Sequence, residues 1–344
     1  MKKLLLIGSN QIHLKNYHEL VAGFFDEVFF ITNSTPSLVP TESMALNFSL
    51  KNPIAGWRTI QAIKKKIKTF HPDVIHIHQA GSFAFYTLLA AKKFNIPVIV
   101  TAWGSDILIS PNRNFALRSM VKYILNHADY FSSDSGFMAV EMNRLADKEL
   151  NVLIANFGID SPSVSVAKEK IIYSNRLHKP LYRIDKIIIA FASWVKKNPD
   201  WKLVIGATGE KTESLKQLAV DLKLNYKIEF VGWLDKKKNE EYYSKSTFYV
   251  SIPESDATSI SLLEAMAHGC IPVVSDLPAN KEWIENGVNG IIVNDLENLF
   301  NSIGAIDIEK AKSLNKKIIE ERATKESNRR KFISLYEKAM HIKK

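Results

Sequence analysis

The sequence predicts an α/β protein with two domains, each built on a parallel β-sheet covered by helices. Short apolar runs rich in β-branched residues alternate with helix-like stretches along both halves of the chain, and this alternation is typical of parallel sheets. A length of 344 residues suits two domains, and an apolar fraction of 46% can fill two cores. No internal repeat or low-complexity segment interrupts the pattern.

The first half begins with an apolar strand at 3–7, which ends at Gly8 and leads through a loop to a helix near 17–25. A dinucleotide-binding fingerprint requires G-x-G-x-x-G here, and only Gly8 is present, so a nicotinamide or flavin enzyme is disfavoured. Gly8 either forms an ordinary turn or lets a ligand approach the backbone. The other expected elements of this half are strands at 28–31, 73–78, 96–101 and 129–135 and helices at 57–70 and 113–127.

The helix at 57–70 is amphipathic, and its two faces differ in charge. Its apolar stripe comprises Trp57, Ile60, Ile63, Ile67 and Phe70, while lysines at positions 64, 65, 66 and 68 fill much of the other face. These lysines either form a solvated face or attract anionic lipid head groups. The sequence alone leaves both interpretations open.

Two histidines alternate in the strand at 73–78, so His76 and His78 lie on one face of the sheet. No further ligands at a suitable spacing accompany them, so a metal site is not indicated. We expect His76 to be a packed polar residue. We expect His78, at the carboxyl end of the strand, to be the better candidate for a binding cleft.

The second half contains a strand–loop–helix–strand unit with polar side chains at one end. The N-terminus of its helix carries unpaired N–H groups and partial positive charge, which suits a phosphate, and Thr258, Ser259 and Ser261 add hydroxyls there. Asp256 and Glu264 are placed to hold a diol, and a phosphate beside a diol describes a nucleotide or a sugar. A simple capped helix fits the same pattern. The expected elements of this half are strands at 170–174, 201–206, 228–232, 247–252 and 271–275 and a helix at 261–268.

Charge and composition narrow the class of partner. The formal net charge of +10 is spread over both halves, which fits anionic donors and an anionic membrane surface better than nucleic acid. A single cysteine, Cys270, excludes an internal disulfide and fits a reducing compartment. The apolar run at the start is too short for a signal sequence, and no run approaches the roughly 18 residues of a membrane span.

The spacing Asp256-x7-Glu264, followed by AMAHGCIPVVSD, resembles the E-x7-E signature of retaining family-4 glycosyltransferases, with Asp in place of the first Glu. The segment NKEWIENGVNG extends the resemblance. It implies the GT-B fold, in which two Rossmann-like domains with parallel sheets face each other across a cleft. The domains would be 1–158 on the acceptor side and 159–322 on the nucleotide-sugar side, with a helix at 323–344 crossing back to the first.

The same resemblance implies a donor site in the second domain. Glu264 would hold the ribose and Asp256 the donor sugar. Arg176, in a segment NRL that resembles the family's G-R-L, would hold the diphosphate unless it forms a surface salt bridge; Arg183, favoured over Lys179 by alignment with the following helix, would assist it. The other expected donor contacts are Gly8, Gly232, Trp233, Thr258, Ser259, Ile260 and Ser261.

The sugar and acceptor side is implied by TAWGSD at 101–106, which resembles the family's T-x-H-G-S-D. Trp103 replaces the His that meets the donor sugar in relatives. Asp106 keeps the motif's acid and either accepts sugar or acceptor hydroxyls or caps the next helix. We therefore place His78, Trp103 and Asp106 on this side of the site.

We expect a retaining glycosyltransferase that moves a sugar from a nucleoside-diphosphate sugar, with UDP favoured over GDP, to a glycan or lipid-linked acceptor in cell-surface polysaccharide biosynthesis. The sequence has no D-x-D triplet and offers cationic side chains instead, so we expect neither a divalent metal nor a cofactor. We expect a cytoplasmic enzyme in peripheral contact with the anionic inner face of the plasma membrane, and no nucleic-acid partner.

Two alternatives come from other classes of protein. A sugar-nucleotide epimerase or hydrolase of the same fold would turn over the donor without an acceptor alcohol. A non-catalytic sugar-nucleotide-binding subunit would bind UDP without releasing it from UDP-sugar. The replacement at Trp103 keeps the second alternative open. An acceptor-dependence assay separates the transferase from an epimerase or hydrolase.

Overall fold

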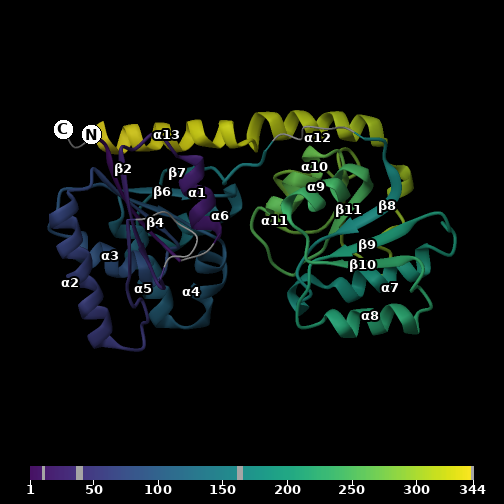
Figure 1. Cartoon of the computed structure of the whole chain (residues 1–344), viewed down its shortest axis with the longest axis horizontal. Coiled ribbons are helices and arrows are strands. Elements are labelled where there is room, and N and C mark those ends of the chain that lie inside the picture. Colours follow the sequence, from purple (N-terminus) through teal and green to yellow (C-terminus); the bar gives the residue numbers. More distant parts are fainter. Residues whose placement is uncertain (10–11, 36–41, 161–165, 342–344) are drawn as a thin grey trace. The chain divides into compact units, whose positions relative to one another are not determined.

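The computed structural model describes residues 1–9, 12–35, 42–160 and 166–341. The chain divides into two compact units, the first formed by Met1–Gly158 with Lys325–Lys344 and the second by Ile159–Thr324 (Figure 1). Every strand pairing in the two described sheets is parallel, and helices cover both faces of each sheet. The predicted class, two Rossmann-like domains with parallel sheets, is therefore confirmed.

The sheet of the first unit has the order β3-β2-β1-β4-β5-β6-β7. The strands are β1 (Lys3–Ile7), β2 (Glu27–Thr32), β3 (Ser43–Ala45), β4 (Val74–His78), β5 (Val98–Thr101), β6 (Tyr130–Ser133) and β7 (Val152–Ile154). The chain proceeds outward from β1 to β3 on one side and from β4 to β7 on the other, so the strand order reverses between β1 and β4. The carboxyl ends of these two strands flank the crevice where open α/β sheets bind ligands.

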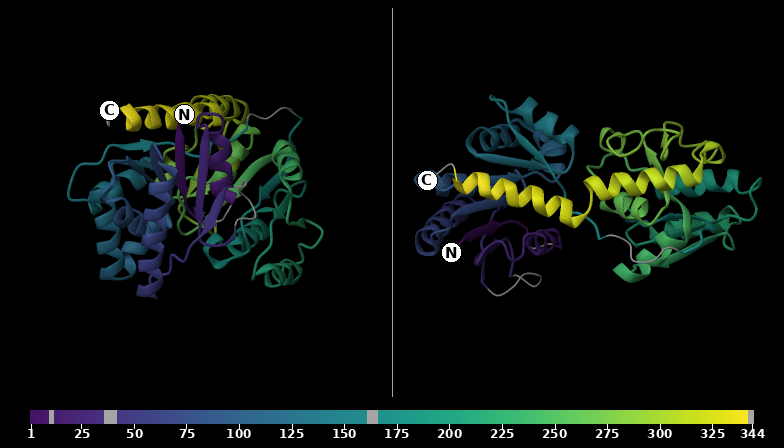
Figure 2. Two further views of the ribbon diagram at one scale, coloured as in Figure 1. Left: turned by 60° about the vertical axis from the view of Figure 1, so that its left-hand side comes forward. Right: turned by 90° about the horizontal axis from the view of Figure 1, so that it is seen from above.

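Both faces of this sheet are covered by helices. The helices are α1 (Ile12–Leu20), α2 (Pro53–Phe70), α3 (Ser82–Ala91), α4 (Ser110–Arg113), α5 (Phe115–His127), α6 (Gly136–Leu145) and α13 (Lys325–His341), with a π-helical turn η1 (Ser105–Ile109) before α4. The face that carries Leu5 and Ile77 packs against α2, α3, α5 and α6. The face that carries Leu4 and Leu6 packs against α1 and α13, and Figure 2 shows α13 running along the first unit.

The second unit repeats this plan with the strand order β10-β9-β8-β11-β12-β13. Its strands are β8 (Glu169–Ser174), β9 (Lys202–Gly206), β10 (Ile228–Gly232), β11 (Ser246–Ser251), β12 (Ile271–Ser275) and β13 (Ile291–Val293). The order reverses between β8 and β11, which are paired directly. The second unit therefore has its own crevice, at the carboxyl ends of β8 and β11.

Helices again cover both faces of the sheet. They are α7 (Ile184–Trp194), α8 (Thr212–Asp221), α9 (Lys236–Lys245), α10 (Ile260–Ala267), α11 (Pro278–Lys281) and α12 (Ile308–Arg322), with 3-10 turns η2 (Pro180–Tyr182) and η3 (Ile303–Ala305). The face that carries Ile172 and Leu203 packs against α7 and α8. The face that carries Tyr173 and Val204 packs against α9 and α10. The site elements α10 and β11 thus rest on a continuous core.

The first helix differs from the expectation of residues 17–25. α1 begins at Ile12 and buries Leu14 as deeply as Tyr17, so its core face starts before the expected first residue. It ends at Leu20, and Gly23 then takes a φ of 77°, a left-handed conformation that glycine adopts without steric cost. The sequence pattern had indicated the helix but not its bounds.

The predicted apolar stripe of α2 was wrong at one residue, Trp57. The side chain of Trp57 is 62% exposed, while Gly56 is buried against α3. A Cβ on Gly56 would lie 2.7 Å from the Tyr86 hydroxyl oxygen, so this close approach of α2 and α3 turns the glycine inward. The neighbouring tryptophan consequently points to solvent.

Candidate active site

The crevice of the second unit gathers residues that are far apart in the sequence. Arg176 follows β8 and Asp256 follows β11, and because these strands are neighbours the two side chains meet across a separation of 80 positions. The pair lies where the strand order reverses. This is the place where open α/β sheets commonly bind ligands.

Arg176 is held from three sides. Its Nη2 donates to Asp256 Oδ2 at 2.7 Å, and its Nη1 donates to Ser259 Oγ. The guanidinium carbon stands 4.5 Å from the centroid of the Tyr182 ring. Only 11% of the side chain is exposed. A fixed cation that is largely shielded from water interacts strongly with an anion that enters its surroundings.

The electrostatics of the pair favour a permanently charged arginine. Burial opposes the charge of Arg176, but Asp256, Tyr249 and Tyr182 outweigh that effect and raise the pKa of the guanidinium. Burial also raises the pKa of Asp256, while Arg176 and the Ala257 N–H act in the opposite direction. Asp256 therefore orients the arginine as its ion-pair partner, a role that the sequence did not indicate.

The N-terminus of α10 opens onto the same loop. Ser259 is the N-cap residue, but its side chain caps no amide within the described chain, and its hydroxyl accepts from Arg176. The N–H groups at the start of the helix therefore keep their partial positive charge for a ligand. Thr258 Oγ1 accepts from Trp283 Nε1 at 3.3 Å, which ties the loop to the core.

Glu264 lies one turn into α10 and joins a buried hydrogen-bond network. Its Oε2 accepts from the Tyr243 hydroxyl at 3.2 Å, and Asn175 Nδ2 donates to the same hydroxyl at 2.7 Å. The Tyr249 hydroxyl donates to Asn175 Oδ1 at 3.1 Å. Burial raises the pKa of Glu264, while the hydrogen bond from Tyr243 acts in the opposite direction. Because Asn175 directly precedes Arg176, the network links the acid of α10 to the arginine.

Sequence reasoning missed four members of this group, Asn175, Tyr182, Tyr243 and Tyr249. The three tyrosines are typical core aromatics in a sequence, and the partners of their hydroxyls come from distant elements. Asn175 had one available signal, its place between a strand end and Arg176. The polar support of the site is therefore a tertiary feature.

Arg183 has a different role from Arg176 in this structure. It precedes α7 with a φ of 51°, and its Nη2 donates to the backbone oxygen of Pro253 at 2.8 Å. Its Nε has no hydrogen-bond partner among the described residues. Arg183 thus fixes the loop that leads from β11 to Asp256, and its expected contact with a diphosphate remains a prediction.

The other expected donor residues of the second unit lie at the end of β10 and at the start of α10. Gly232 ends β10 with a φ of 68°, and open space surrounds the place of its missing Cβ. Trp233 is 73% exposed and offers a free aromatic face. Ile260 and Ser261 open α10 and are partly buried. Their contacts with a nucleotide remain predictions.

In the first unit, the reversal between β1 and β4 sets Gly8 beside His78. A Cβ on Gly8 would lie 3.1 Å from the Cβ of His78 and from Cδ1 of Leu14, so the missing side chain serves close packing. His78 is fully buried, and its Nδ1 accepts from Trp103 Nε1 at 3.1 Å. Trp103 and Tyr17 pack against its ring, and the expected contact of His78 with a sugar or acceptor remains a prediction.

His76 is packed in the core, as expected. Its Nδ1 lies 2.6 Å from the Tyr336 hydroxyl of α13, and its Nε2 lies 2.7 Å from Thr101 Oγ1. Tyr336 also meets the hydroxyl of Tyr17 at 2.8 Å. Burial and then the neighbouring His78 lower the pKa of His76 well below its usual range. This network fastens the last helix to the sheet of the first unit.

Asp106 holds two loops together. It is 5% exposed and accepts hydrogen bonds from the N–H groups of Ala80 at 2.6 Å and Trp103 at 3.0 Å. Burial raises the pKa of Asp106, and these backbone hydrogen bonds act in the opposite direction. Asp106 thus ties the loop after β4 to the loop after β5, and its expected contact with sugar or acceptor hydroxyls remains a prediction.

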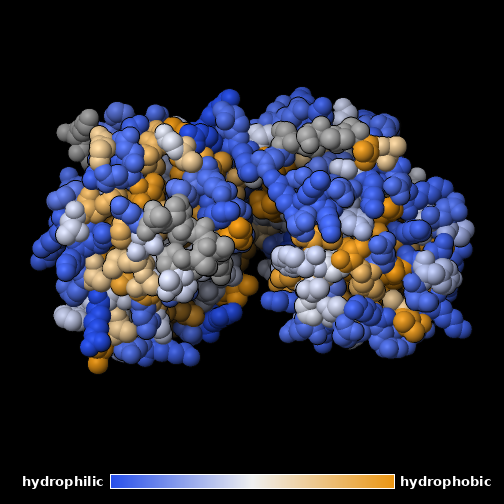
Figure 3. Space-filling view, viewed as in Figure 1, coloured by the Kyte–Doolittle hydropathy of each residue, from blue (hydrophilic) through white to orange (hydrophobic). Residues whose placement is uncertain are grey.

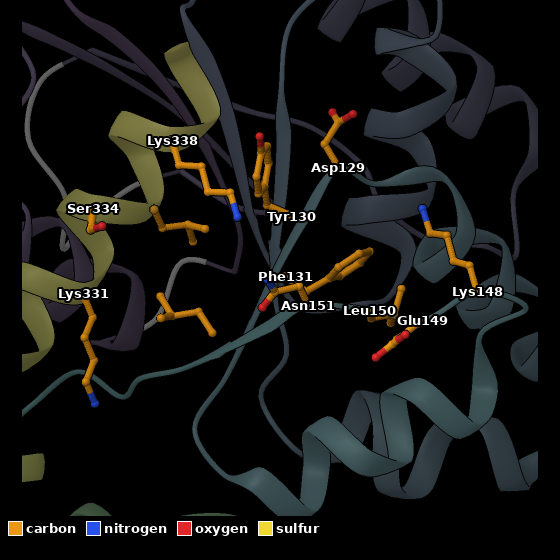
Figure 4. Close-up of a pocket in the computed structure, with 12 residues that line it drawn as sticks. Asp129, Tyr130, Phe131, Lys148, Glu149, Leu150, Asn151, Lys331, Ser334 and Lys338 are labelled. Carbon is orange, nitrogen blue, oxygen red and sulfur yellow. The ribbon is translucent and has the colours of Figure 1, made fainter. Parts of the chain in front are cut away.

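A separate cavity of about 420 Å³ lies at the opposite edge of the first sheet, between α13 and the start of β6 and β7 (Figure 4). Lys331 and Lys338 extend from α13 beside it, and Lys148 lies across from them. None of the expected site residues is among the described residues that line it.

In the described part of the chain, no group of three or more His, Cys, Asp or Glu could hold a metal ion, and no helix suits a membrane crossing.

Comparison with known proteins defines first the fold and then the family. The crystal structure of HepE from Anabaena in complex with UDP matches with a TM-score of 0.80 and 14% identity, over 98% of this chain and all of the other. This likeness identifies the GT-B fold. Residues 3–135 match the family model described as glycosyl transferase 4-like, and residues 160–323 match glycosyl transferases group 1. Both halves of the chain thus match glycosyltransferase models, and together the two matches identify a GT-B glycosyltransferase of the family-4 type.

Two curated relatives match this chain over only part of their own length. The alpha-monoglucosyldiacylglycerol synthase of Streptococcus pneumoniae is 22% identical over 66% of this chain and 57% of its own length. The sulfoquinovosyl transferase of Arabidopsis thaliana is 24% identical over 62% of this chain and 44% of its own length. The chain thus spans about half the length of these relatives.

Proposed function

We propose that this protein is a retaining glycosyltransferase that needs no divalent metal and takes a nucleoside-diphosphate sugar, UDP in preference to GDP, on the unit 159–324. The observation that carries the proposal is the Arg176 cluster at the reversal between β8 and β11. A shielded cation, a hydroxyl and an uncapped helix N-terminus converge there, and all three favour a diphosphate. The UDP complex of the structural relative supports the choice of base.

Sugar transfer breaks the bond between the anomeric carbon and the diphosphate oxygen. Negative charge grows on the leaving diphosphate, and the sugar gains oxocarbenium character. Arg176 and the N-terminus of α10 would stabilise that charge without reorganising, and one such contact contributes about 2.7–4 kcal/mol to a transition state. In the retaining course the acceptor approaches from the face that the diphosphate leaves, and a diphosphate oxygen takes its proton.

The two acids would each bind a different part of the donor, one the ribose and the other the sugar. Glu264, held by Tyr243, would accept both hydroxyls of the ribose. Asp256 holds Arg176 before binding and would turn to the donor sugar when the diphosphate becomes the partner of the arginine. Both carboxyls are largely shielded from water, which strengthens their hydrogen bonds to a ligand.

The acceptor would be a hydroxyl of a glycan or of a lipid-linked glycan. The name of one curated relative, an alpha-monoglucosyldiacylglycerol synthase, supports a lipid acceptor. A cavity of about 540 Å³ at the carboxyl edge of the first sheet supports an uncharged one. Its described lining is free of charged side chains and consists of Asn33, Ala45, Leu46, Asn47, Phe48, Ser49, Ser82 and Phe83.

Peripheral contact with the inner, anionic face of a membrane completes the proposal. Ile54, Trp57 and Phe115 are 66%, 62% and 84% exposed at the first turns of α2 and α5, and lysines and arginines follow on both helices. Hydrophobic side chains break the hydrophilic surface of the first unit in several places (Figure 3). Sedimentation with phosphatidylglycerol vesicles should fall in a Trp57→Ser, Phe115→Ser variant, and unchanged binding would refute the contact.

Replacement of Arg176 tests the enzymatic proposal. Arg176→Ala should lower kcat by about 10²–10³-fold, because it removes one preorganised donor to the leaving group. Arg176→Lys should retain part of the rate, and Arg144→Ala, which removes an exposed arginine of the first unit, should be neutral. The assay measures UDP release from UDP-sugars with and without acceptor alcohols, EDTA present, and the anomer of the product by NMR.

Other outcomes of this assay refute the proposal in different ways. Full activity of folded Arg176→Ala would remove the assigned site. Donor turnover without an acceptor would identify a hydrolase or epimerase. Binding of UDP without any turnover would identify a binding subunit, and an inverted product would exclude the retaining course.

A further inference from the structure

The two ring nitrogens of His78 are in unequal surroundings. His78 ends β4 in the crevice of the first unit, and its side chain has no exposed surface. Its Nδ1 lies 3.1 Å from the indole Nε1 of Trp103. An indole N–H can only donate a hydrogen bond, so Nδ1 must accept and cannot carry a proton.

The proton of the neutral ring is consequently on Nε2. Burial, followed by the nearby His13, lowers the pKa of His78 to about 3, so the ring is neutral at physiological pH. Nε2 is buried and has no hydrogen-bond partner among the residues that the structure describes. A buried N–H without a partner costs about 1–3 kcal/mol, and such groups are rare without a functional reason.

The groups around the ring leave this donor for a ligand. The nearest hydroxyl-bearing ring, Tyr17, lies 4.4 Å from His78 by ring centroids, but its hydroxyl is bonded to Tyr336. His76 uses both of its nitrogens on Tyr336 and Thr101. Phe157 stacks at 6.3 Å and has no polar atom to offer.

We propose that His78 Nε2–H donates a hydrogen bond to an uncharged hydroxyl oxygen of a sugar substrate, and that Trp103 positions it by fixing the proton on that nitrogen. This inference rests on the proposed function and adds the substrate chemistry of the first unit. A hydroxyl is favoured over a phosphate because the ring is neutral and its described neighbours are aromatic, so nothing there offsets the desolvation of an anion.

The same tautomer excludes one role and requires one movement. A ring that is protonated on Nε2 and occupied on Nδ1 has no free lone pair, so His78 cannot act as a general base. Because Nε2 is covered, a neighbouring side chain must turn aside for a substrate oxygen. His13 is exposed and contacts Trp103 edge to face at 5.0 Å.

Amide replacements test the donor directly. The amide nitrogen of Gln stands near the place of Nε2, whereas that of Asn stands near Nδ1. We expect His78→Gln to keep kcat/KM within about threefold and His78→Asn and His78→Leu to lose about 5–100-fold, mainly at subsaturating sugar substrate. His127→Gln, at an exposed histidine, is the matched control. UDP affinity should be unchanged in every variant, because the proposed nucleotide site lies in the other unit.

The tautomer is measured independently of activity by ¹⁵N NMR of the histidine ring nitrogens. Wild-type His78 should show a proton on Nε2 at pH 7, and Trp103→Phe should give a mixture of tautomers with a smaller loss of kcat/KM. A proton on Nδ1 in the wild type, or wild-type kcat/KM in folded His78→Leu and His78→Asn, would overturn the inference. A wild-type chain that binds no UDP would instead overturn the proposed function, while the NMR result would still decide the tautomer.

Discussion

The two crevices of this protein have the same topology but differ in charge: the side chains of one are charged and those of the other are neutral. In the second unit the reversal between β8 and β11 carries an ion pair, a partly buried carboxylate and a helix N-terminus. In the first unit the reversal between β1 and β4 carries a glycine, a neutral histidine and an indole. A Rossmann-like sheet therefore fixes where a ligand can bind, and the side chains at the strand ends fix which chemistry it can have.

The neighbours of Arg176 and of His78 explain why one side chain is charged and the other is neutral. Arg176 meets negative charge most effectively when it is shielded from water and held in place, and Asp256, Ser259 and Tyr182 achieve this. His78 is surrounded by aromatic rings and loses its charge instead. The second unit is thus suited to a diphosphate and the first to neutral hydroxyl groups.

The largest expected effect lies in the charged crevice. Glu264→Gln should weaken UDP binding by about 10–150-fold, because a hydrogen bond to a charged acceptor contributes about 1.5–3 kcal/mol and an amide cannot accept both ribose hydroxyls. The fold should survive, since the amide oxygen can still accept from Tyr243. Isothermal titration calorimetry with UDP measures the change. Equal affinity in the variant would contradict the assignment of Glu264 to the ribose.

The free energy of unfolding should depend on pH because His78 is neutral in the folded protein. A buried histidine whose folded pKa lies below its unfolded value of about 6.5 destabilises the fold as pH falls below 6.5, because the unfolded chain binds the proton more readily. His78, with a folded pKa of about 3, should therefore cost up to about 1.4 kcal/mol per pH unit between those values.

His78→Gln isolates that contribution. Hydrogen exchange of β4 and β5 amides at pH 6.5 and pH 5 should show a smaller loss of stability in the variant than in the wild type, by about 1–2 kcal/mol. His76, which remains in both proteins, contributes equally to the two curves. Identical pH slopes would mean that His78 carries its charge in the folded protein.

An effect on stability rather than on binding should come from the packing of the neutral crevice. Gly8→Ala places a Cβ 3.1 Å from His78 and Leu14, both fully buried, and should cost about 1–3 kcal/mol of unfolding free energy. Gly81→Ala, at a position with nothing within 4 Å of the added atom, is the control. Urea unfolding measures both. A stable Gly8→Ala protein with weakened UDP binding would favour a ligand-contact role for Gly8.

Sequence reasoning found the second crevice more readily than the first. Asp256, Ser259 and Glu264 lie within one segment, so their spacing on a loop and a helix is visible in a single stretch. Arg176 was assigned to a phosphate or a salt bridge, and the structure gives it the ion pair with Asp256 that long-range strand pairing creates. The first crevice was harder, because burial rather than spacing decides the state of His78.

The errors have physical causes of the same kind. Trp57 belongs to the apolar period of α2, yet the close contact of Gly56 with Tyr86 turns it outward. The partners of Asp106 were also out of reach of the sequence, because the loop after β4 brings the Ala80 N–H to its carboxylate. These contacts cannot be predicted from a local sequence pattern, because the partners come from neighbouring elements.

The sequence by itself determined that strands and helices alternate in two parallel-sheet units and that an acid pair stands at the start of one helix. These features follow from local spacing, because the periods of strands and helices and the location of a helix N-terminus are properties of short segments. Only the tertiary structure decided that Asp256 holds Arg176 and that His78 is buried against Trp103. Strand order sets those contacts, and the desolvation that accompanies them sets the charge of each group.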